Sequence, residues 1–69
     1  MKIEEVKQNL GKIVEYNGAE YNEKKGVYKL TACIFRKNEA GFFYQAELLD
    51  TKHGASVLIC KLENVRALQ

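Results

Sequence analysis

The amino-acid sequence predicts a mainly β protein with five strands, a short N-terminal helix and a single 3-10 turn before the last strand. From Lys12 onward, apolar side chains recur at every second position, which is the spacing of a half-buried strand. Single glycines separate the alternating runs, as in hairpins. With 69 residues, 46% of them hydrophobic and none of them proline, the chain suits one small domain, and this composition excludes a disordered linker.

The first ten residues are expected to form the helix. Ile3, Val6 and Leu10 are spaced by three and four positions, so their side chains lie on one helical face. Gly11 follows at the position where a helix commonly ends in the left-handed conformation. Because so short a helix is unstable alone, we expect its apolar stripe to dock on the rest of the domain.

Alternation begins with residues 12–16, the first predicted strand. The Asn17-Gly18 dipeptide after it favours a tight type I′ turn, in which both central residues have positive φ. A polar, lysine-rich stretch follows at 20–26. The remaining long strands are predicted at 27–37, 42–50 and 56–61.

Two glycines set the expected strand register. Gly41 and Gly54 each stand third in a predicted three-residue loop, 39–41 and 52–54. These loops place Ala46 opposite Ile34 and Cys60, with apolar residues gathered on one face of the meander. That face is Tyr28, Leu30, Ala32, Ile34, Phe42, Tyr44, Ala46, Leu48, Leu58, Cys60 and Leu62. The opposite face combines Lys29, Thr31, Cys33, Gln45, Glu47 and Lys61 with Phe35, Phe43, Leu49, Val57 and Ile59.

The last residues break the alternation, with a 3-10 turn expected at 62–65 and a short strand at 66–68. Over residues 12–68 this order of elements resembles the SH3-like small barrel, with 17–26 as the long first loop and 52–54 as the distal hairpin. The resemblance implies a closed five-stranded barrel within a single domain, 1–69, whose helical segment is 1–10. The chain also resembles small uncharacterised prophage or mobile-element proteins of Gram-positive bacteria.

Two departures from the SH3 family bear on function. The chain has no tryptophan, and Glu20 and Glu23 in the first loop are balanced by Lys24 and Lys25. Eukaryotic-type SH3 domains bind proline-rich peptides with a tyrosine and tryptophan groove beside an acidic loop. Recognition of proline-rich peptides is therefore not implied here.

The candidate binding surface is the outer, mixed face of the sheet. It is more apolar than solvation explains, and cations flank its two phenylalanines. We expect a non-catalytic module that binds another protein or a second copy through this face, unless the N-terminal helix covers it. The expected protein-binding residues are Phe35, Phe43, Arg36, Lys37, Leu49, Val57 and Ile59. The alternative is a nucleic-acid-binding accessory protein that uses Lys24, Lys25, Lys29, Arg36, Lys37 and Arg66.

Neither catalysis nor metal binding is expected. Asp50, His53 and Ser56 are spaced like a triad but lie around a predicted exposed turn, which gives no shielded base. With His53, the two cysteines Cys33 and Cys60 supply three preferred zinc ligands where four are needed. We therefore expect no catalytic residue, no metal and no cofactor, and two reduced thiols.

Three tyrosines, Tyr16, Tyr21 and Tyr28, bracket the first loop. Their rings either close one end of the core with hydroxyls outward or line a shallow groove. No apolar stretch is long enough to span a bilayer, and the first five residues lack the apolar core of a signal peptide. A cytoplasmic protein without membrane contact is expected.

Overall fold

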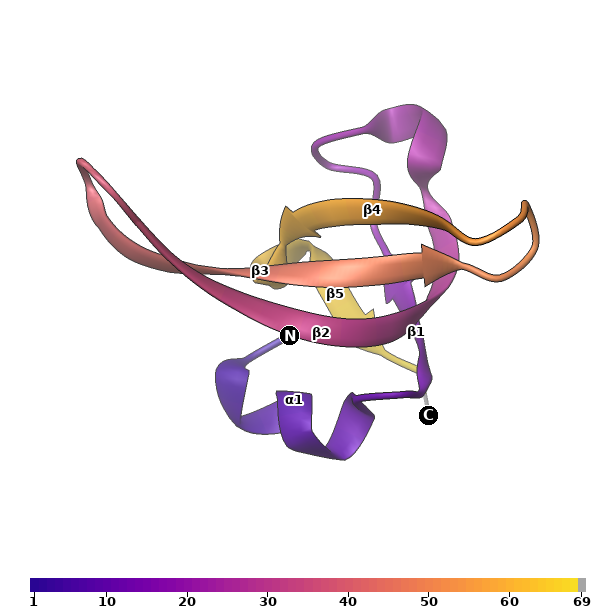
Figure 1. Ribbon diagram of the computed structural model, residues 1–69, viewed down its shortest axis with the longest axis horizontal. Coiled ribbons are helices and arrows are strands. Elements are labelled where there is room, and N and C mark those ends of the chain that lie inside the picture. Colours follow the sequence, from indigo (N-terminus) through magenta and orange to yellow (C-terminus); the bar gives the residue numbers. More distant parts are fainter. Residues whose placement is uncertain (69) are drawn as a thin grey trace.

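The computed structural model describes residues 1–68. The described chain forms one helix, two 3-10 turns and five strands, and the strands build a twisted sheet (Figure 1). In chain order these are α1 (Ile3–Asn9), β1 (Ile13–Tyr16), η1 (Asn22–Lys24), β2 (Gly26–Asn38), β3 (Gly41–Asp50), β4 (Ser56–Lys61), η2 (Leu62–Asn64) and β5 (Val65–Ala67).

All five strands belong to one antiparallel sheet with the order β4-β3-β2-β1-β5. This confirms the predicted mainly β fold, its N-terminal helix and its 3-10 turn before the last strand. No ladder joins β4 to β5 within residues 1–68, so the sheet is open and closure into a barrel is not confirmed. The chain turns away from the sheet in η2 directly after β4, and β5 is only three residues long.

The hydrophobic core lies against one side of the sheet, which we call the inner face. Tyr16, Leu30 and Leu48 are its largest fully buried side chains, and the Tyr16 and Tyr28 rings meet edge to face at 6.4 Å. Burial of such side chains is the main stabilising contribution in so small a domain. The complete cluster is Val6, Val14, Tyr16, Tyr28, Leu30, Ala46, Leu48, Cys60, Leu62 and Val65.

Helix α1 packs on this core and not on the outer face of the sheet. Its Val6 side chain is buried in the core cluster, whereas Ile3 and Leu10 remain exposed. The helix begins where the Lys2 N–H donates to the Glu5 carboxylate (2.8 Å) and ends before Gly11, which has φ +84° as expected. The hypothesis that α1 covers the outer face is therefore wrong, because its one buried apolar side chain faces the inner cluster.

The β3–β4 register agrees with the prediction. Ala46 pairs with Cys60 and Leu48 with Leu58. The ladder ends at the Asp50–Ser56 pair, so the loop spans 51–55 and is longer than the predicted 52–54. Within it Gly54 has φ +71°, the positive value that was predicted.

The predicted β2–β3 register is wrong. Ala46 pairs with Cys33 in place of Ile34, and Phe35 pairs with Tyr44. The hairpin loop is two residues long, between Asn38 and Gly41, which shortens the predicted loop by one. Gly41 nevertheless has positive φ, at +125°.

The shorter hairpin loop shifts the β2–β3 register by one residue, and a β-bulge at Thr31 shifts it by one more. Leu30 pairs with Leu48 before it and Ala32 pairs with Glu47 after it, so Thr31 is the extra residue. The Thr31 hydroxyl lies within hydrogen-bond distance of two Glu47 acceptors, the carboxylate Oε1 at 2.8 Å and the backbone carbonyl oxygen at 3.0 Å. Because the bulge adds one residue, side chains of β2 exchange faces beyond it.

The Asn17-Gly18 turn also differs from the prediction. Gly18 has φ +79°, but Asn17 has no positive φ, so the type I′ turn does not form. Asn17 instead accepts the Ala19 N–H on its side chain (2.8 Å) and donates its own N–H to the Asn64 carbonyl (3.0 Å). These bonds join the start of a longer loop to η2, and the chain returns to the sheet only at Gly26.

Candidate functional site

The β2–β3 hairpin extends beyond its neighbours, and we call residues 32–44 the β2–β3 arm (Figure 1). The β1–β2 ladder reaches only from Gly26 to Lys29, and the β3–β4 ladder stops at Gln45. Two backbone hydrogen bonds join Leu30 to Gly11 and Lys12, and within the arm β2 and β3 pair only with each other. The arm therefore has two unpaired edges and projects from the body of the domain.

Three aromatic side chains form an exposed cluster on the inner face of the arm. Phe35 stacks on Phe42 with ring centroids 5.1 Å apart, and its centroid lies 5.0 Å from that of Tyr44. Their residues remain 58% (Phe35), 66% (Phe42) and 38% (Tyr44) exposed. The Lys37 ammonium lies 5.5 Å from the Phe42 ring centroid, which is within cation–π range. The arm thus presents a largely exposed aromatic surface beside a cation.

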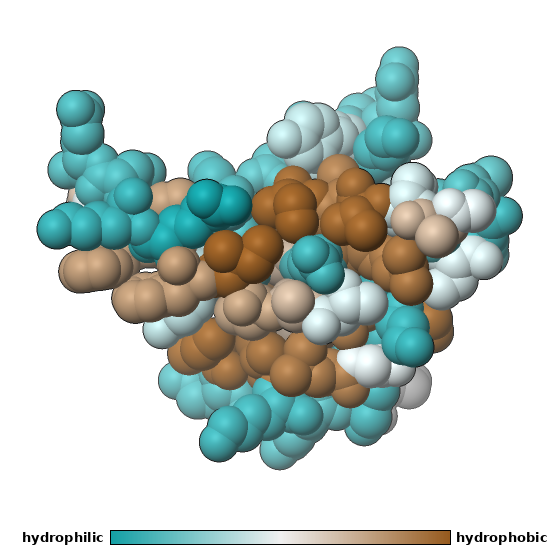
Figure 2. Space-filling model, viewed as in Figure 1, coloured by the Kyte–Doolittle hydropathy of each residue, from teal (hydrophilic) through white to brown (hydrophobic). Residues whose placement is uncertain are grey.

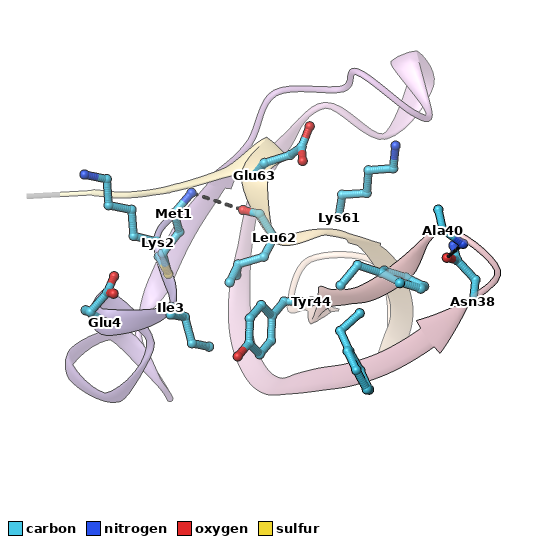
Figure 3. A pocket seen from close by; sticks show the side chains of 13 residues that line it. Met1, Lys2, Ile3, Glu4, Asn38, Ala40, Tyr44, Lys61, Leu62 and Glu63 are labelled. Atoms are coloured by element: carbon cyan, nitrogen blue, oxygen red, sulfur yellow. Dashed lines mark hydrogen bonds between the residues drawn. The ribbon is translucent and has the colours of Figure 1, made fainter.

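A cavity of about 600 Å³ adjoins this cluster (Figure 3). Tyr44 points into it between the start of α1 and the arm, with Ile3 on the opposite side. Residues 1–4, 40–44 and 61–63 supply most of its lining. The volume is within the usual range of ligand sites, and the lining is mainly apolar.

The structure divides the predicted protein-binding surface between the two faces. Phe43 and Arg36 pair on the outer face, whereas Phe35 and Lys37 lie on the inner face because the Thr31 bulge moves them there. The expectation that Phe35 and Phe43 share a surface is therefore wrong. Leu49, Val57 and Ile59 do lie on the outer face of the sheet body.

The outer face is apolar but interrupted. Val57 is 55% exposed, while Leu49 and Ile59 are half-buried. Glu47 pairs with Ile59, and Gln45 pairs with Lys61, so polar side chains separate the apolar ones. Figure 2 shows apolar atoms over β3 and β4 with hydrophilic atoms between them.

The predicted basic residues do not form one surface. Arg66 forms an ion pair with Glu15 across the β1–β5 ladder, and Lys37 lies over the Phe42 ring. The other members lie in separate places: Lys24 and Lys25 in and after η1, and Lys29 and Arg36 on the outer face.

The Asp50, His53 and Ser56 group has the geometry of a turn. Asp50 accepts the N–H groups of Lys52 (2.9 Å) and His53 (3.0 Å) and contacts His53 Nδ1 at 3.1 Å. The Lys52 N–H bond, together with those of His53, lowers the pKa of the Asp50 carboxyl. The Asp50 carboxylate therefore makes its hydrogen bonds within the 51–55 loop.

The two cysteines are free thiols, and burial raises the pKa of both. Cys60 lies in the core, where burial raises the pKa of its thiol to about 12. Cys33 is half-buried at the base of the arm. Among the described residues, no group of three or more His, Cys, Asp or Glu side chains is placed to hold a metal ion.

The hydroxyl groups of Tyr16 and Tyr28 form hydrogen bonds with the backbone of the first loop. The fully buried Tyr16 accepts the N–H groups of Glu20 and Tyr21 on its hydroxyl, both at 2.9 Å. The Tyr28 hydroxyl donates to the Lys24 carbonyl. Both rings therefore close the core with their hydroxyls bonded to the loop, while Tyr21 is exposed.

Residues Phe42 and Tyr44 are the part of the site that sequence reasoning missed, because it assigned both to the buried face. Strand length carried the signal. The predicted strands at 27–37 and 42–50 exceed their neighbours at 12–16 and 56–61. Such a difference leaves one end of the long hairpin without neighbours to cover it.

Comparisons with protein-family models, with curated proteins and with solved structures find no match to this chain. In the part of the chain that the structure describes, no helix has both the length and the apolar character needed to cross a membrane.

Proposed function

We propose that the protein is a non-catalytic interaction module that binds another protein through the inner side of the β2–β3 arm. The observation that carries this proposal is the exposed stack of Phe35, Phe42 and Tyr44 beside a cavity of about 600 Å³. Contiguous exposed aromatic surface is uncommon on a solitary small domain. Aromatic anchors next to a pocket are the usual energetic centres of protein interfaces.

The charges around the cavity favour a protein over a nucleic acid. Among the lining side chains, Lys2 and Lys61 are matched by Glu4 and Glu63, and the Met1 amino group is bonded to the Leu62 carbonyl. A nucleic-acid site would instead present a consistent excess of cations toward the phosphates. An apolar segment of a protein suits a balanced lining, because it introduces no charge of its own.

Binding of single-stranded nucleic acid is the alternative proposal. Lys37 over the stacked Phe42 ring provides an aromatic platform beside one cation, which is the combination that holds unpaired bases. Steep loss of affinity with salt would identify this function, whereas apolar contacts respond weakly to salt.

We further propose that the fold is an open relative of the SH3-like small barrel. The position of β1 between β2 and β5, and the η2 turn directly before β5, support this relationship. A cytoplasmic location is part of the same proposal, since a reducing compartment would keep Cys33 and Cys60 as free thiols.

The test is a selection of displayed peptides on the immobilised protein, followed by affinity measurements with two matched variants. Phe42→Ser removes an exposed arm side chain, and Val57→Ser removes an exposed side chain of the outer face. We expect Phe42→Ser to weaken binding more than about tenfold and Val57→Ser to leave it within about twofold, with unchanged melting temperatures.

Two results would contradict the proposal. Loss of affinity in Val57→Ser alone would place the binding surface on the outer face. Binding of single-stranded oligonucleotides that falls steeply with salt, without any selected peptide, would support the alternative function.

A further inference from the structure

We propose that the partner binds as an additional β-strand on the free edge of β3, in line with β4, as an extended segment with apolar side chains at alternate positions. This inference rests on the proposed function and specifies its binding mode. Addition of a peptide strand to a sheet edge is an established form of recognition, in which main-chain hydrogen bonds provide much of the affinity.

Strand β4 leaves the edge of β3 before the arm begins. The last pair of their ladder is Gln45–Lys61, and η2 begins at Leu62. The Val65 N–H closes that turn by donating to the Leu62 carbonyl, and the Met1 amino group donates to the same oxygen (3.1 Å). The carbonyl that would continue the ladder is thereby bonded elsewhere.

The main-chain groups of β3 point alternately toward β2 and away from it. Asn38 and Gly41 flank a two-residue loop, so they form a hydrogen-bonded pair. Antiparallel strands alternate such pairs, which directs the N–H and C=O groups of Phe43 toward β2 and those of Phe42 toward the opposite edge. The Tyr44 N–H points, like the Phe42 groups, to the edge of β3 that faces away from β2. These edge groups are available to a further strand.

The cavity lies beside the edge of β3. It contacts Phe42, Phe43 and Tyr44, three consecutive residues of a strand. Because consecutive side chains point to opposite faces of a sheet, a space that touches all three lies at the strand's edge and not over either face. Figure 3 shows the Tyr44 side chain on the side of the cavity that faces Ile3.

Two other elements stand opposite the β3 edge across this space. Residues 1–4 and 61–63 line it together with the arm, so a wall stands opposite the β3 edge. Because α1 and η2 stand opposite this edge, we expect it to receive a single extended strand and not the sheet of a second copy. The segment's inward side chains would contact Tyr44 and Ile3, which favours apolar residues at alternate positions.

The length of the edge fixes the length of the bound segment. Gly41–Tyr44 provides four residues, which at about 3.4 Å each span about 14 Å. A segment of four to six residues, roughly, is sufficient to cover this edge.

The probe for the test is a capped peptide of alternating threonine and valine, about five residues long to match the length of the edge. Amide exchange of the isotopically labelled protein is followed by NMR with and without the peptide. We expect the peptide to slow exchange of the Phe42 and Tyr44 amides by about tenfold or more, because they gain hydrogen bonds. The Phe43 and Gln45 amides, which face β2, are the internal control and change little.

Backbone N-methylation of the peptide makes the test specific for strand addition. Valines whose side chains face inward also direct their N–H groups to β3, so their methylation should weaken binding by about tenfold or more. Methylation of the threonines, whose N–H groups face away, should change affinity by less than about threefold.

Three outcomes would overturn the inference. Equal effects of methylation at both kinds of position would show that no strand forms, as would unchanged exchange of Phe42 and Tyr44 on binding. In either of these two cases, loss of affinity of the selected peptides in Phe42→Ser would mean that the proposed function stands and that only the strand mode fails. If neither the probe nor any selected peptide binds the arm, both fail.

Discussion

Substitution of Ala46 by leucine is expected to destabilise the domain through overpacking of the core. Ala46 is fully buried in the middle of β3, and its register partners on the inner face are Cys33 in β2 and Cys60 in β4. Ala46 belongs to the same core cluster as larger side chains such as Leu48. Leucine adds a branched side chain where no space is open, so neighbouring side chains must leave their preferred rotamers.

The expected loss is on the order of 1–3 kcal/mol in the free energy of unfolding. Domains of this size have about 0.05–0.15 kcal/mol of stability per residue, so the loss is a large fraction of the total. Each kcal/mol lowers the melting temperature of a domain of this length by about 4–8 °C. Ala46→Leu should therefore melt at least about 4 °C below the wild type.

The assay is thermal and urea unfolding followed by circular dichroism. Ala32→Leu is the matched control, because Ala32 lies on the outer face opposite Glu47 and is only half-buried. We expect the control to melt within about 3 °C of the wild type. Equal melting temperatures for Ala46→Leu and the wild type would refute the register on which this reasoning depends.

Three further predictions concern turns, loops and pH. Gly54→Ala should destabilise by about 1 kcal/mol because Gly54 has φ +71°, whereas Ala55→Gly should stabilise because alanine has φ +55° there; urea unfolding measures both. Tyr16→Phe should cost about 1–3 kcal/mol, since the N–H groups of Glu20 and Tyr21 lose their acceptor; normal stability and unchanged amide exchange in the loop would contradict this. Burial raises the pKa of Cys60 to about 12, so the folded protein retains a proton that the unfolded chain loses above about pH 9. Unfolding free energy should therefore fall as pH rises from about 9 to 12, by up to about 1.4 kcal/mol per pH unit, and Cys60→Ala should show a smaller fall.

The parts of the fold that sequence reasoning predicted are those in which local chemistry and side-chain alternation agree. The β3–β4 register was predictable because Leu48 opposite Leu58 and Ala46 opposite Cys60 are the pairs that keep one face apolar. The helix end at Gly11 was predictable because a left-handed residue is needed there. Both depend on interactions between near neighbours in sequence or space.

The β2–β3 register was not predictable in the same way, because both faces of β2 are apolar beyond Leu30. Residues Ile34 and Phe35 are equally acceptable on a buried face, so alternation alone does not select between them. The bulge at Thr31 is stabilised by contacts with Glu47 that only the folded sheet provides. A one-residue irregularity therefore moves Phe35 to the inner face without a marked signal in the sequence.

The candidate site was predicted in part. Sequence reasoning selected Phe35 and Lys37 as interface residues; Phe35 belongs to the exposed aromatic cluster of the arm, and Lys37 lies beside it over the Phe42 ring. It assigned Phe42 and Tyr44 to the core, because it treated the predicted face as buried along its whole length. Burial depends on which strands cover that face, and β1 and β4 end before the arm begins.

An NMR titration of the labelled protein with a peptide selected for binding would locate the binding surface residue by residue. We expect the largest chemical-shift changes on Ile3, Phe35, Phe42 and Tyr44, which surround the cavity and the stack. Resonances of Val57 and Ile59 on the outer face of the sheet body should change little. Largest changes at Val57 and Ile59, with the arm unaffected, would contradict this expectation.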